Sequence, residues 1–393
     1  MLDFVTPDSE NPVYLDHAAT SPVWPEVLDA MLPYLRGEFA NPSSVHAPGV
    51  RARRALDEAR ERVTAALGAA PAADRPVEVT FTSGGTEANN LAVLGFVRAR
   101  ATDRVVTSAV EHPCVRLSAA AAAEERAVPH VEVPTDRDGV LDLDALAAAL
   151  TEKTTFVALI HGQNETGVRQ PIARAAAVVR RRAPRAHLHV DAVQSFTKVP
   201  LEEVVATADS VALSAHKIGG PKGVGALVRF TGRAPVPLVR GGGQEGDVRS
   251  GTENVAGIVG FGAACETARA HGRADLEERG GRVRAAFEAL ADATVLGADA
   301  PRLPTIVAAA VGGVRGEVLQ HHLEEEGVIV GTGSACHARK SALSPTYAAL
   351  GLSEAEARSV VRVSLSHATR DADLDRFESA LPAAVTRVRE FVG

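Results

Sequence analysis

The chain contains 393 residues, of which 46% are hydrophobic and 23% are charged, so it can bury large cores and is not a disordered protein. Its formal net charge of −7 argues against direct binding of nucleic acid, which requires a basic surface. No apolar run approaches the ~20 residues of a membrane span, and the segment MLDFVTPDSENP lacks the pattern of a signal peptide, so we expect a cytoplasmic protein without membrane association.

The first two thirds of the chain alternate between strand-like and helical runs. We expect a helix to begin near Pro25 and a charged surface helix to follow at 50–67. The predicted strands then lie at 77–82, 105–108, 131–133, 155–160, 187–190 and from 211 onwards, with helices among them at 88–97 and 141–150. This alternation predicts an α/β fold with a mostly parallel sheet flanked by helices.

The pattern changes after residue 254. We expect a long helical tract at 255–291 with a break near Gly280-Gly281, and then strands at 305–310 and 328–330. Helices at 317–326 and 373–391 complete an α+β pattern. The sequence therefore predicts a large domain at 17–256 and a smaller α+β domain formed by 1–16 and 257–393.

Polar side chains follow the ends of several predicted strands. In a mostly parallel sheet, ligands bind beyond the carboxyl ends of the strands, so we expect these side chains to share one site. They are Thr86, His112, Asn164, Asp191, Gln194 and Lys217.

Lys217 and Asp191 fit the two chemical needs of pyridoxal phosphate. The cofactor requires a lysine amine for a Schiff base and a carboxylate that keeps its ring nitrogen protonated. The glycine turn Ser83-Gly84-Gly85 lies between a strand and a helix, where free backbone N–H groups favour a phosphate. Taken alone, Lys217 could be a solvated loop lysine, His112 a surface histidine, and the turn a helix cap.

The three cysteines, Cys114, Cys265 and Cys336, lie far apart, so the sequence indicates neither a disulfide framework nor a metal site. The positions of Cys114 and Cys265 suit buried packing residues. Cys336 has polar and basic neighbours that favour its thiolate, as a catalytic thiol requires. Arg362 lies in an apolar strand, where its charge is costly unless it meets an anion.

Together these stretches resemble the cysteine desulfurases, the NifS/IscS-like branch of the class V aminotransferase family of fold-type I pyridoxal-phosphate enzymes. The resemblance runs from YLDHAAT to the last predicted helix. Its most specific matches, in chain order, are FTSGGTEANN, VEHPCV, HVDAVQS, SAHKIGGPKGVGAL, GGGQE, VRSGTEN and GTGSACHARKSALSP. It implies a large domain like that of aspartate aminotransferase.

The resemblance also implies a role for each position. Lys217 is expected to hold pyridoxal phosphate and Asp191 to pair with its ring nitrogen. Gln194 is expected to contact the ring hydroxyl, and His112 to stack on the ring and act as an acid or base. The residues expected at the phosphate are Gly85, Thr86, Ser214, His216 and, from a second subunit, Thr252.

Asn164 and Arg362 are expected to hold the carboxylate of the substrate. Cys336 is expected to take the sulfur of L-cysteine as a persulfide and deliver it to an acceptor protein, for iron–sulfur cluster assembly or thiolation. The resemblance thus implies a homodimeric cysteine desulfurase that releases L-alanine. The alternatives are another class V enzyme, such as a selenocysteine lyase or a small-amino-acid aminotransferase, and a sulfur-relay protein without catalysis.

Overall fold

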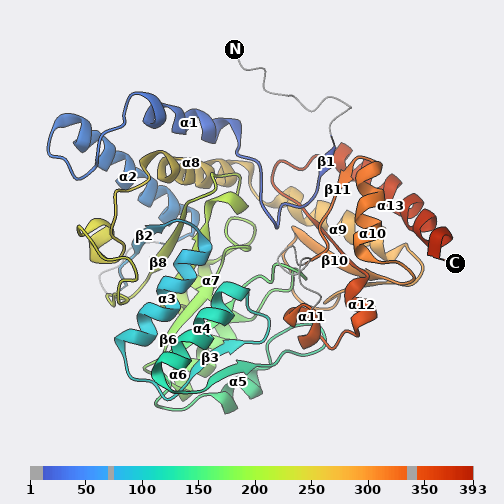
Figure 1. The fold of residues 1–393 in the computed structure, drawn as a ribbon, viewed down its shortest axis with the longest axis horizontal. Coiled ribbons are helices and arrows are strands. Elements are labelled where there is room, and N and C mark those ends of the chain that lie inside the picture. The colour runs from blue at the N-terminus through green and yellow to red at the C-terminus, as the bar shows by residue number, and fades with distance from the viewer. Residues whose placement is uncertain (1–11, 70–74, 334–342, 393) are drawn as a thin grey trace.

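The computed structural model describes residues 12–69, 75–333 and 343–392. Within these ranges the strands form a seven-stranded, a three-stranded and a two-stranded sheet. Figure 1 shows the seven-stranded sheet and its helices in the larger part of the molecule. The two smaller sheets and the C-terminal helices form the other part.

The strands are β1 (Val13–Tyr14), β2 (Glu78–Thr82), β3 (Val105–Ser108), β4 (His130–Val133), β5 (Phe156–Ile160), β6 (His187–Asp191), β7 (Ser210–Ser214), β8 (Gly225–Arg229), β9 (Ala293–Val295), β10 (Ile306–Val311), β11 (Val328–Ile329) and β12 (Val360–Ser364). The helices are α1 (Pro25–Arg36), α2 (Ala47–Ala66), α3 (Gly85–Ala99), α4 (Pro113–Arg126), α5 (Leu143–Ala149), α6 (Ile172–Arg182), α7 (Glu202–Thr207), α8 (Val255–His271), α9 (Ala274–Glu288), α10 (Gly316–Glu325), α11 (Pro345–Ala349), α12 (Glu354–Arg358) and α13 (Asp371–Val392). Two short 3₁₀ helices are η1 (Ala215–Lys217) and η2 (Gln244–Asp247).

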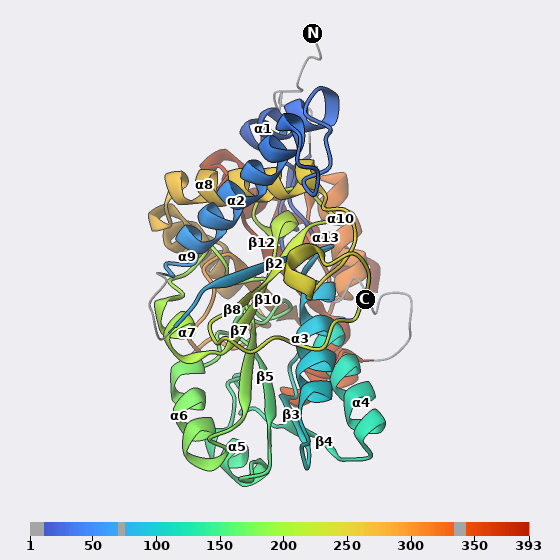
Figure 2. The same cartoon turned by 90° about the vertical axis from the view of Figure 1, so that its left-hand side faces the viewer.

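The large sheet has the strand order β2-β8-β7-β6-β5-β3-β4, and β8 alone runs against the others. This confirms the predicted, mostly parallel sheet. Helices α5, α6 and α7 cover one face, and α3 and α4 cover the other (Figure 2). Every residue of β5, β6 and β7 is buried, because both faces of these strands pack against helices.

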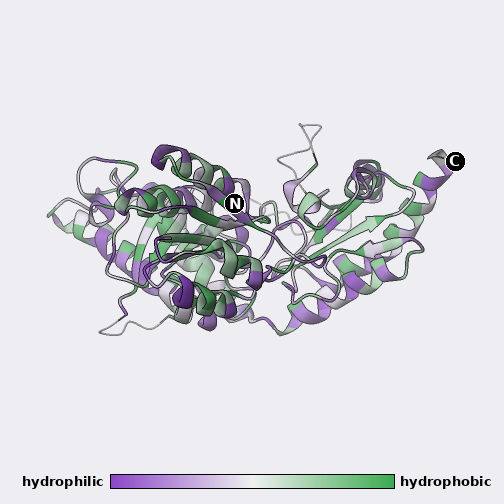
Figure 3. Ribbon diagram, turned by 90° about the horizontal axis from the view of Figure 1, so that it is seen from below, coloured by the Kyte–Doolittle hydropathy of each residue, from purple (hydrophilic) through white to green (hydrophobic). Residues whose placement is uncertain are grey.

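The smaller part is built on the antiparallel sheet β12-β10-β9, which packs against α9, α10 and α13. Strand β1 pairs in parallel with β11, with Val13 opposite Val328, so the start of the described chain lies beside its C-terminal third. In Figure 3 the strands of both parts are mostly hydrophobic, whereas the helices also carry hydrophilic residues. No helix in the described ranges is long and apolar enough to cross a membrane.

The predicted helix break near Gly280-Gly281 is wrong. The helical tract is interrupted at Gly272, which has φ +70° and ends α8, and α9 continues through residues 280 and 281. Gly280 has a packing role instead, since a Cβ there would lie 2.1 Å from the carbonyl oxygen of Pro304. The glycine lets α9 approach that backbone closely.

Candidate active site

A cavity of about 590 Å³ lies at the carboxyl edge of the large sheet. Strands β2, β5, β6 and β7 end there, and the loops that follow them supply most of its wall. Ten of the residues predicted for the site line this cavity: Gly85, Thr86, His112, Asn164, Asp191, Gln194, Ser214, His216, Lys217 and Arg362.

Two predicted site residues are not among these ten. Thr252 is exposed and is not part of the cavity wall of its own chain. Cys336 lies outside the described residues, so its predicted role stays a prediction. Gly333, three positions earlier in the sequence, does line the cavity.

Lys217 reaches the loop that follows β1. Its Nζ donates hydrogen bonds to the carbonyl oxygens of Ala18, at 2.5 Å, and Ala19, at 2.6 Å. The amide nitrogen of Gln194 donates to the same Ala18 oxygen at 2.9 Å. The lysine amine is therefore held inside the cavity wall rather than in solvent.

A second buried lysine, Lys198, was not predicted as part of the site. Its Nζ lies 3.3 Å from Oε1 of Gln194, which turns the amide nitrogen of Gln194 toward Ala18. Burial, together with the charges of Lys217 and Arg362, lowers the pKa of Lys198 to about 7. A lysine in the polar run QSFTK gave no sequence signal of burial.

Asp191 ends β6 and is buried at the cavity wall. Its Oδ1 accepts from the backbone N–H of Val193 at 3.0 Å, and its Oδ2 accepts from Nδ2 of Asn89 at 2.8 Å. Burial raises the pKa of Asp191, whereas His112 and these two donors oppose that rise and favour the carboxylate. Asn89 was missed by the sequence reasoning, although a polar residue between Ala88 and Leu91 on an apolar helix face signals a buried partner.

His112 caps the N-terminus of α4. Its Nδ1 accepts from the backbone N–H of Cys114 at 3.2 Å and lies 2.9 Å from Sγ of the same residue. Burial lowers the pKa of His112; Asp191 opposes this shift and Lys217 adds to it. The neutral ring with two donors at Nδ1 carries its proton on Nε2.

The two described cysteines differ from each other. Cys265 is fully buried in a hydrophobic cluster, as predicted. Cys114 also packs against a hydrophobic cluster, as predicted, but it is only partly buried, because it lines the cavity and contacts Asn89 and His112. Burial raises the pKa of the Cys114 thiol far above its usual range, and Asp191 raises it further, so the group stays protonated.

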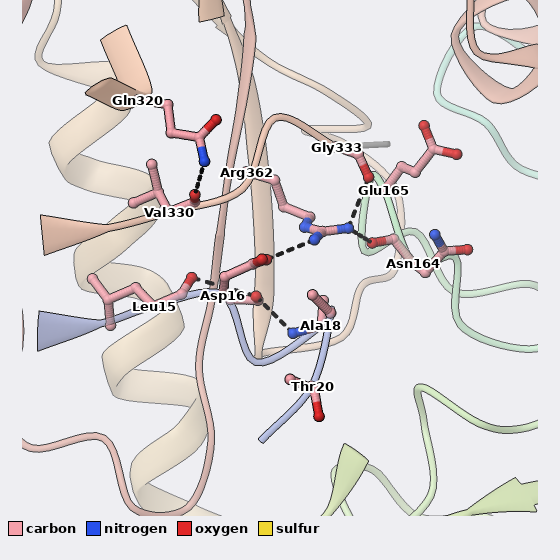
Figure 4. Close-up of polar contacts among 12 residues, drawn as sticks. Leu15, Asp16, Ala18, Thr20, Asn164, Glu165, Gln320, Val330, Gly333 and Arg362 are labelled. Atoms are coloured by element: carbon pink, nitrogen blue, oxygen red, sulfur yellow. Dashed lines mark hydrogen bonds and ion pairs between the residues drawn. The ribbon is translucent and has the colours of Figure 1, made fainter. Parts of the chain in front are cut away.

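The guanidinium of Arg362 pairs with the carboxylate of Asp16, a residue that the sequence reasoning did not single out. Its Nη2 lies 2.7 Å from Oδ1 of Asp16, and its Nη1 donates to the carbonyl oxygens of Asn164, at 2.8 Å, and Gly333, at 2.9 Å. Figure 4 shows these contacts joining three segments around one guanidinium. Oδ1 of Asn164 is buried and, among the described residues, has no hydrogen-bond partner. Asp16 belongs to the stretch YLDHAAT and lies two residues after the end of β1, and no feature of that stretch pointed to Arg362 as its partner.

Another part of the cavity wall suits an anion. The N-terminus of α3 lies there with Gly85 and Thr86, and Oγ of Ser214 is buried without a hydrogen-bond partner in the described ranges. Burial lowers the pKa of His216 to about 4, and its Nδ1 lies 3.1 Å from Oγ1 of Thr20. An unsatisfied hydroxyl at a helix N-terminus is the donor set that a phosphate needs, so these residues fit the phosphate of pyridoxal phosphate.

Comparisons with known proteins identify the family of the chain. The model of the family "Aminotransferase class-V" matches residues 13–377. A cysteine desulfurase of Sinorhizobium fredii is 39% identical over 96% of this chain and 98% of its own length. The cysteine desulfurase IscS of Dictyoglomus turgidum is 37% identical over 96% of this chain and 95% of its own length.

Solved structures share the fold. A NifS-like protein superposes with a TM-score of 0.84 at 30% identity, covering 96% of this chain and 100% of its own. The protein SspA, solved in complex with cysteine, gives a TM-score of 0.77 at 32% identity over 90% of this chain and 98% of its own. These matches confirm the predicted fold class and the predicted resemblance.

Proposed function

Since the chain belongs to the class-V aminotransferase family and is a cysteine desulfurase, as its curated relatives are, we propose that it moves the sulfur of L-cysteine to Cys336. The products are L-alanine and a persulfide on Cys336, which an acceptor protein then takes over. The observation that carries this proposal is a single cavity lined by Lys217, Asp191, Ser214 and Arg362.

Lys217, Asp191 and Ser214 would hold pyridoxal phosphate in that cavity. When bound, the cofactor accepts the electrons released at the α-carbon of the substrate. The amine of Lys217 would hold the cofactor and move the α-proton, and the carboxylate of Asp191 would keep the ring nitrogen protonated. Gln194 would face the ring hydroxyl, and Ser214, His216 and the N-terminus of α3 would receive the phosphate.

Arg362 and Asn164 would orient L-cysteine by its carboxylate. One arginine N–H already faces Asp16, so the substrate would compete for the N–H groups that now meet the carbonyl oxygens of Asn164 and Gly333. The flat ring of His112 would lie against the cofactor and exchange protons through Nε2.

The sulfur transfer balances without an external oxidant or reductant. The thiolate of Cys336 attacks the sulfur of L-cysteine, an S–S bond forms, and the Cβ–S bond breaks with its electrons left on Cβ. Proton uptake at Cβ and at Cα then gives L-alanine, while the sulfur stays on Cys336 as a persulfide.

We also propose a homodimer in the cytoplasm. Thr252 is exposed and is not part of the cavity wall of its own chain, which supports a role at the phosphate of a second subunit. The three widely spaced cysteines indicate a reducing compartment.

The test is product analysis with the purified protein and pyridoxal phosphate. L-Cysteine should give equal amounts of L-alanine and transferred sulfur, and Lys217→Ala should abolish both products together with the visible absorbance of the bound cofactor. Lys222→Ala is the matched control, because Lys222 lines the same cavity and has no proposed bond to the cofactor. Formation of a keto acid without sulfur release would indicate an aminotransferase, and activity on selenocysteine alone would indicate a selenocysteine lyase.

A further inference from the structure

A chain of buried polar side chains runs from Asp191 away from the cavity. Oδ2 of Asp191 lies 2.8 Å from Nδ2 of Asn89 in α3, and Oδ1 of Asn89 lies 2.9 Å from Nε2 of His189 in β6. Nδ1 of His189 then lies 2.8 Å from Oγ of Ser210 in β7. None of these four residues is more than 4% exposed, so water does not compete for their hydrogen bonds.

The carboxylate at one end determines which atom donates at every step. An ionised carboxylate only accepts hydrogen bonds, so Asn89 turns its nitrogen to Asp191 and its oxygen to His189. His189 therefore carries its proton on Nε2 and accepts at Nδ1 from the hydroxyl of Ser210. The same hydroxyl oxygen accepts from Nε2 of His187 at 2.8 Å. A flipped Asn89 amide would bring two oxygens together at Asp191, so the chain has one direction.

Both imidazoles in the chain are neutral. Burial lowers the pKa of His189 to about 3 and places the pKa of His187 well below its usual range. The ring of His187 stacks on Phe96 with 3.6 Å between their centroids, and its Nδ1 has no hydrogen-bond partner within the described ranges. The series of hydrogen bonds that begins at Asp191 therefore ends at His187, beside the apolar ring of Phe96.

Neutral donors have a specific consequence for Asp191. An arginine or lysine at the position of Asn89 would form an ion pair with the carboxylate of Asp191 and neutralise much of its charge. The amide of Asn89 holds Oδ2 in place and leaves the negative charge available to a cation in the cavity. Its second N–H faces Sγ of Cys114 at 3.3 Å, so every polar atom of the Asn89 side chain is engaged.

We propose that Asn89 and His189 are positioning residues that hold Asp191 as an oriented, ionised carboxylate facing the cavity. This inference rests on the proposed function, in which Asp191 pairs with the ring nitrogen of pyridoxal phosphate. Asn89 and His189 act through Asp191 and do not bind the cofactor themselves.

The first test has a readout other than cofactor binding or activity. NMR spectra of the full-length protein with ¹⁵N-labelled histidine, recorded before and after removal of pyridoxal phosphate, report which ring nitrogen of each histidine is protonated. The resonances lost in His189→Gln identify His189. They should show a neutral ring protonated on Nε2 in both samples, and a proton on Nδ1 or a charged ring would overturn the inference.

The second test measures the dissociation constant of pyridoxal phosphate. Asn89→Ala and His189→Leu should weaken binding roughly 10- to 100-fold, as expected for a disturbed hydrogen bond to a charged group. His189→Gln should stay close to the wild type, because a glutamine amide can donate to Asn89 and accept from Ser210. The matched control is Asn90→Ala, which removes an amide one position along α3 whose hydrogen bond, within the described part of the chain, goes to the carbonyl oxygen of Thr86 in its own helix.

The outcomes separate the two proposals. If the wild type binds pyridoxal phosphate and Asn89→Ala binds it as tightly as Asn90→Ala does, the inference is overturned and the proposed function stands. If the wild type binds no pyridoxal phosphate, the proposed function is overturned, and the cofactor role of Asn89 with it. Thermal melting of each variant shows whether it folds, and the tautomer measurement on the wild type does not require Asn89→Ala or His189→Leu to fold.

Discussion

Nη2 of Arg362 lies 2.7 Å from Oδ1 of Asp16, although 346 residues separate them in the chain. The contact joins the middle of β12 to the loop after β1, and the same loop supplies the carbonyl oxygens that receive Lys217. One short N-terminal segment thus holds both the arginine and the lysine of the cavity.

Removing Asp16 should therefore destabilise the protein strongly. The side chain of Arg362 is only 4% exposed, so Asp16→Ala leaves a buried charge without its counterion. We expect the free energy of unfolding to fall by roughly 3 kcal/mol. Urea denaturation measures this loss, and the exposed pair Arg358–Glu354 provides the control, because Glu354→Ala should cost less than about 1 kcal/mol. Equal losses in the two variants would contradict the role of Asp16.

Ser214→Ala should weaken the hold on the phosphate alone. The Ser214 hydroxyl is buried and has no partner among the described residues, so a bound phosphate would satisfy it. We expect the dissociation constant of pyridoxal phosphate to rise by roughly tenfold. Titration with pyridoxal, which lacks the phosphate, should not distinguish Ser214→Ala from the wild type. A similar loss for both ligands would place Ser214 elsewhere than at the phosphate.

Buried neutral histidines should make the protein labile to mild acid. Burial lowers the pKa of His161 to about 4, whereas an unfolded histidine titrates near 6.5. Between these values the unfolded state binds the proton and the folded state does not, so stability is full above about pH 6.5 and falls as the pH drops toward 4. His17 adds to the effect, with a pKa also lowered to about 4 by burial.

Urea midpoints at several pH values between 4 and 8 test this expectation. His161→Gln should reduce the loss of stability between pH 6.5 and 4. His321→Gln should leave it unchanged, because the side chain of His321 is 77% exposed. A wild-type midpoint that does not change between pH 7.5 and 5 would show that these histidines are not buried as neutral rings.

Cys114→Ala should keep the desulfurase activity. Cys114 lines the cavity, but burial and Asp191 raise its pKa and keep the thiol protonated, which makes it a poor nucleophile. The rate of alanine formation should therefore stay close to that of the wild type. If Cys114→Ala lost sulfur transfer while still binding the cofactor, the assignment of Cys336 as the sulfur carrier would be contradicted.

Much of this site could be predicted from the sequence because it follows local rules. Asp191 ends β6 and Lys217 comes three residues after the end of β7, and the carboxyl ends of parallel strands meet at one edge, so their proximity follows from the strand pattern. The glycine turn before α3 likewise marks a helix N-terminus. These features need no knowledge of tertiary contacts.

The missed features depend on contacts between distant segments. The role of Asp16 depends on its ion pair with Arg362, and the role of Asn89 depends on its hydrogen bonds with Asp191 and His189. No spacing in the sequence predicts such contacts. Gly280 looked like a helix break because its packing against Pro304 is invisible in the sequence. Lys198 was not singled out, because its burial is set by neighbours from other parts of the chain.

The most direct test of the whole account is the fate of sulfur in Cys336→Ala. Mass spectrometry of the wild type after brief exposure to L-cysteine should find one added sulfur on the peptide that contains Cys336. Cys336→Ala should still bind pyridoxal phosphate and change its absorbance with L-cysteine, because Lys217, Asp191 and Ser214 remain, but it should form neither alanine nor persulfide. Alanine formation by Cys336→Ala at the wild-type rate, or added sulfur only on Cys114 or Cys265, would contradict the proposed mechanism.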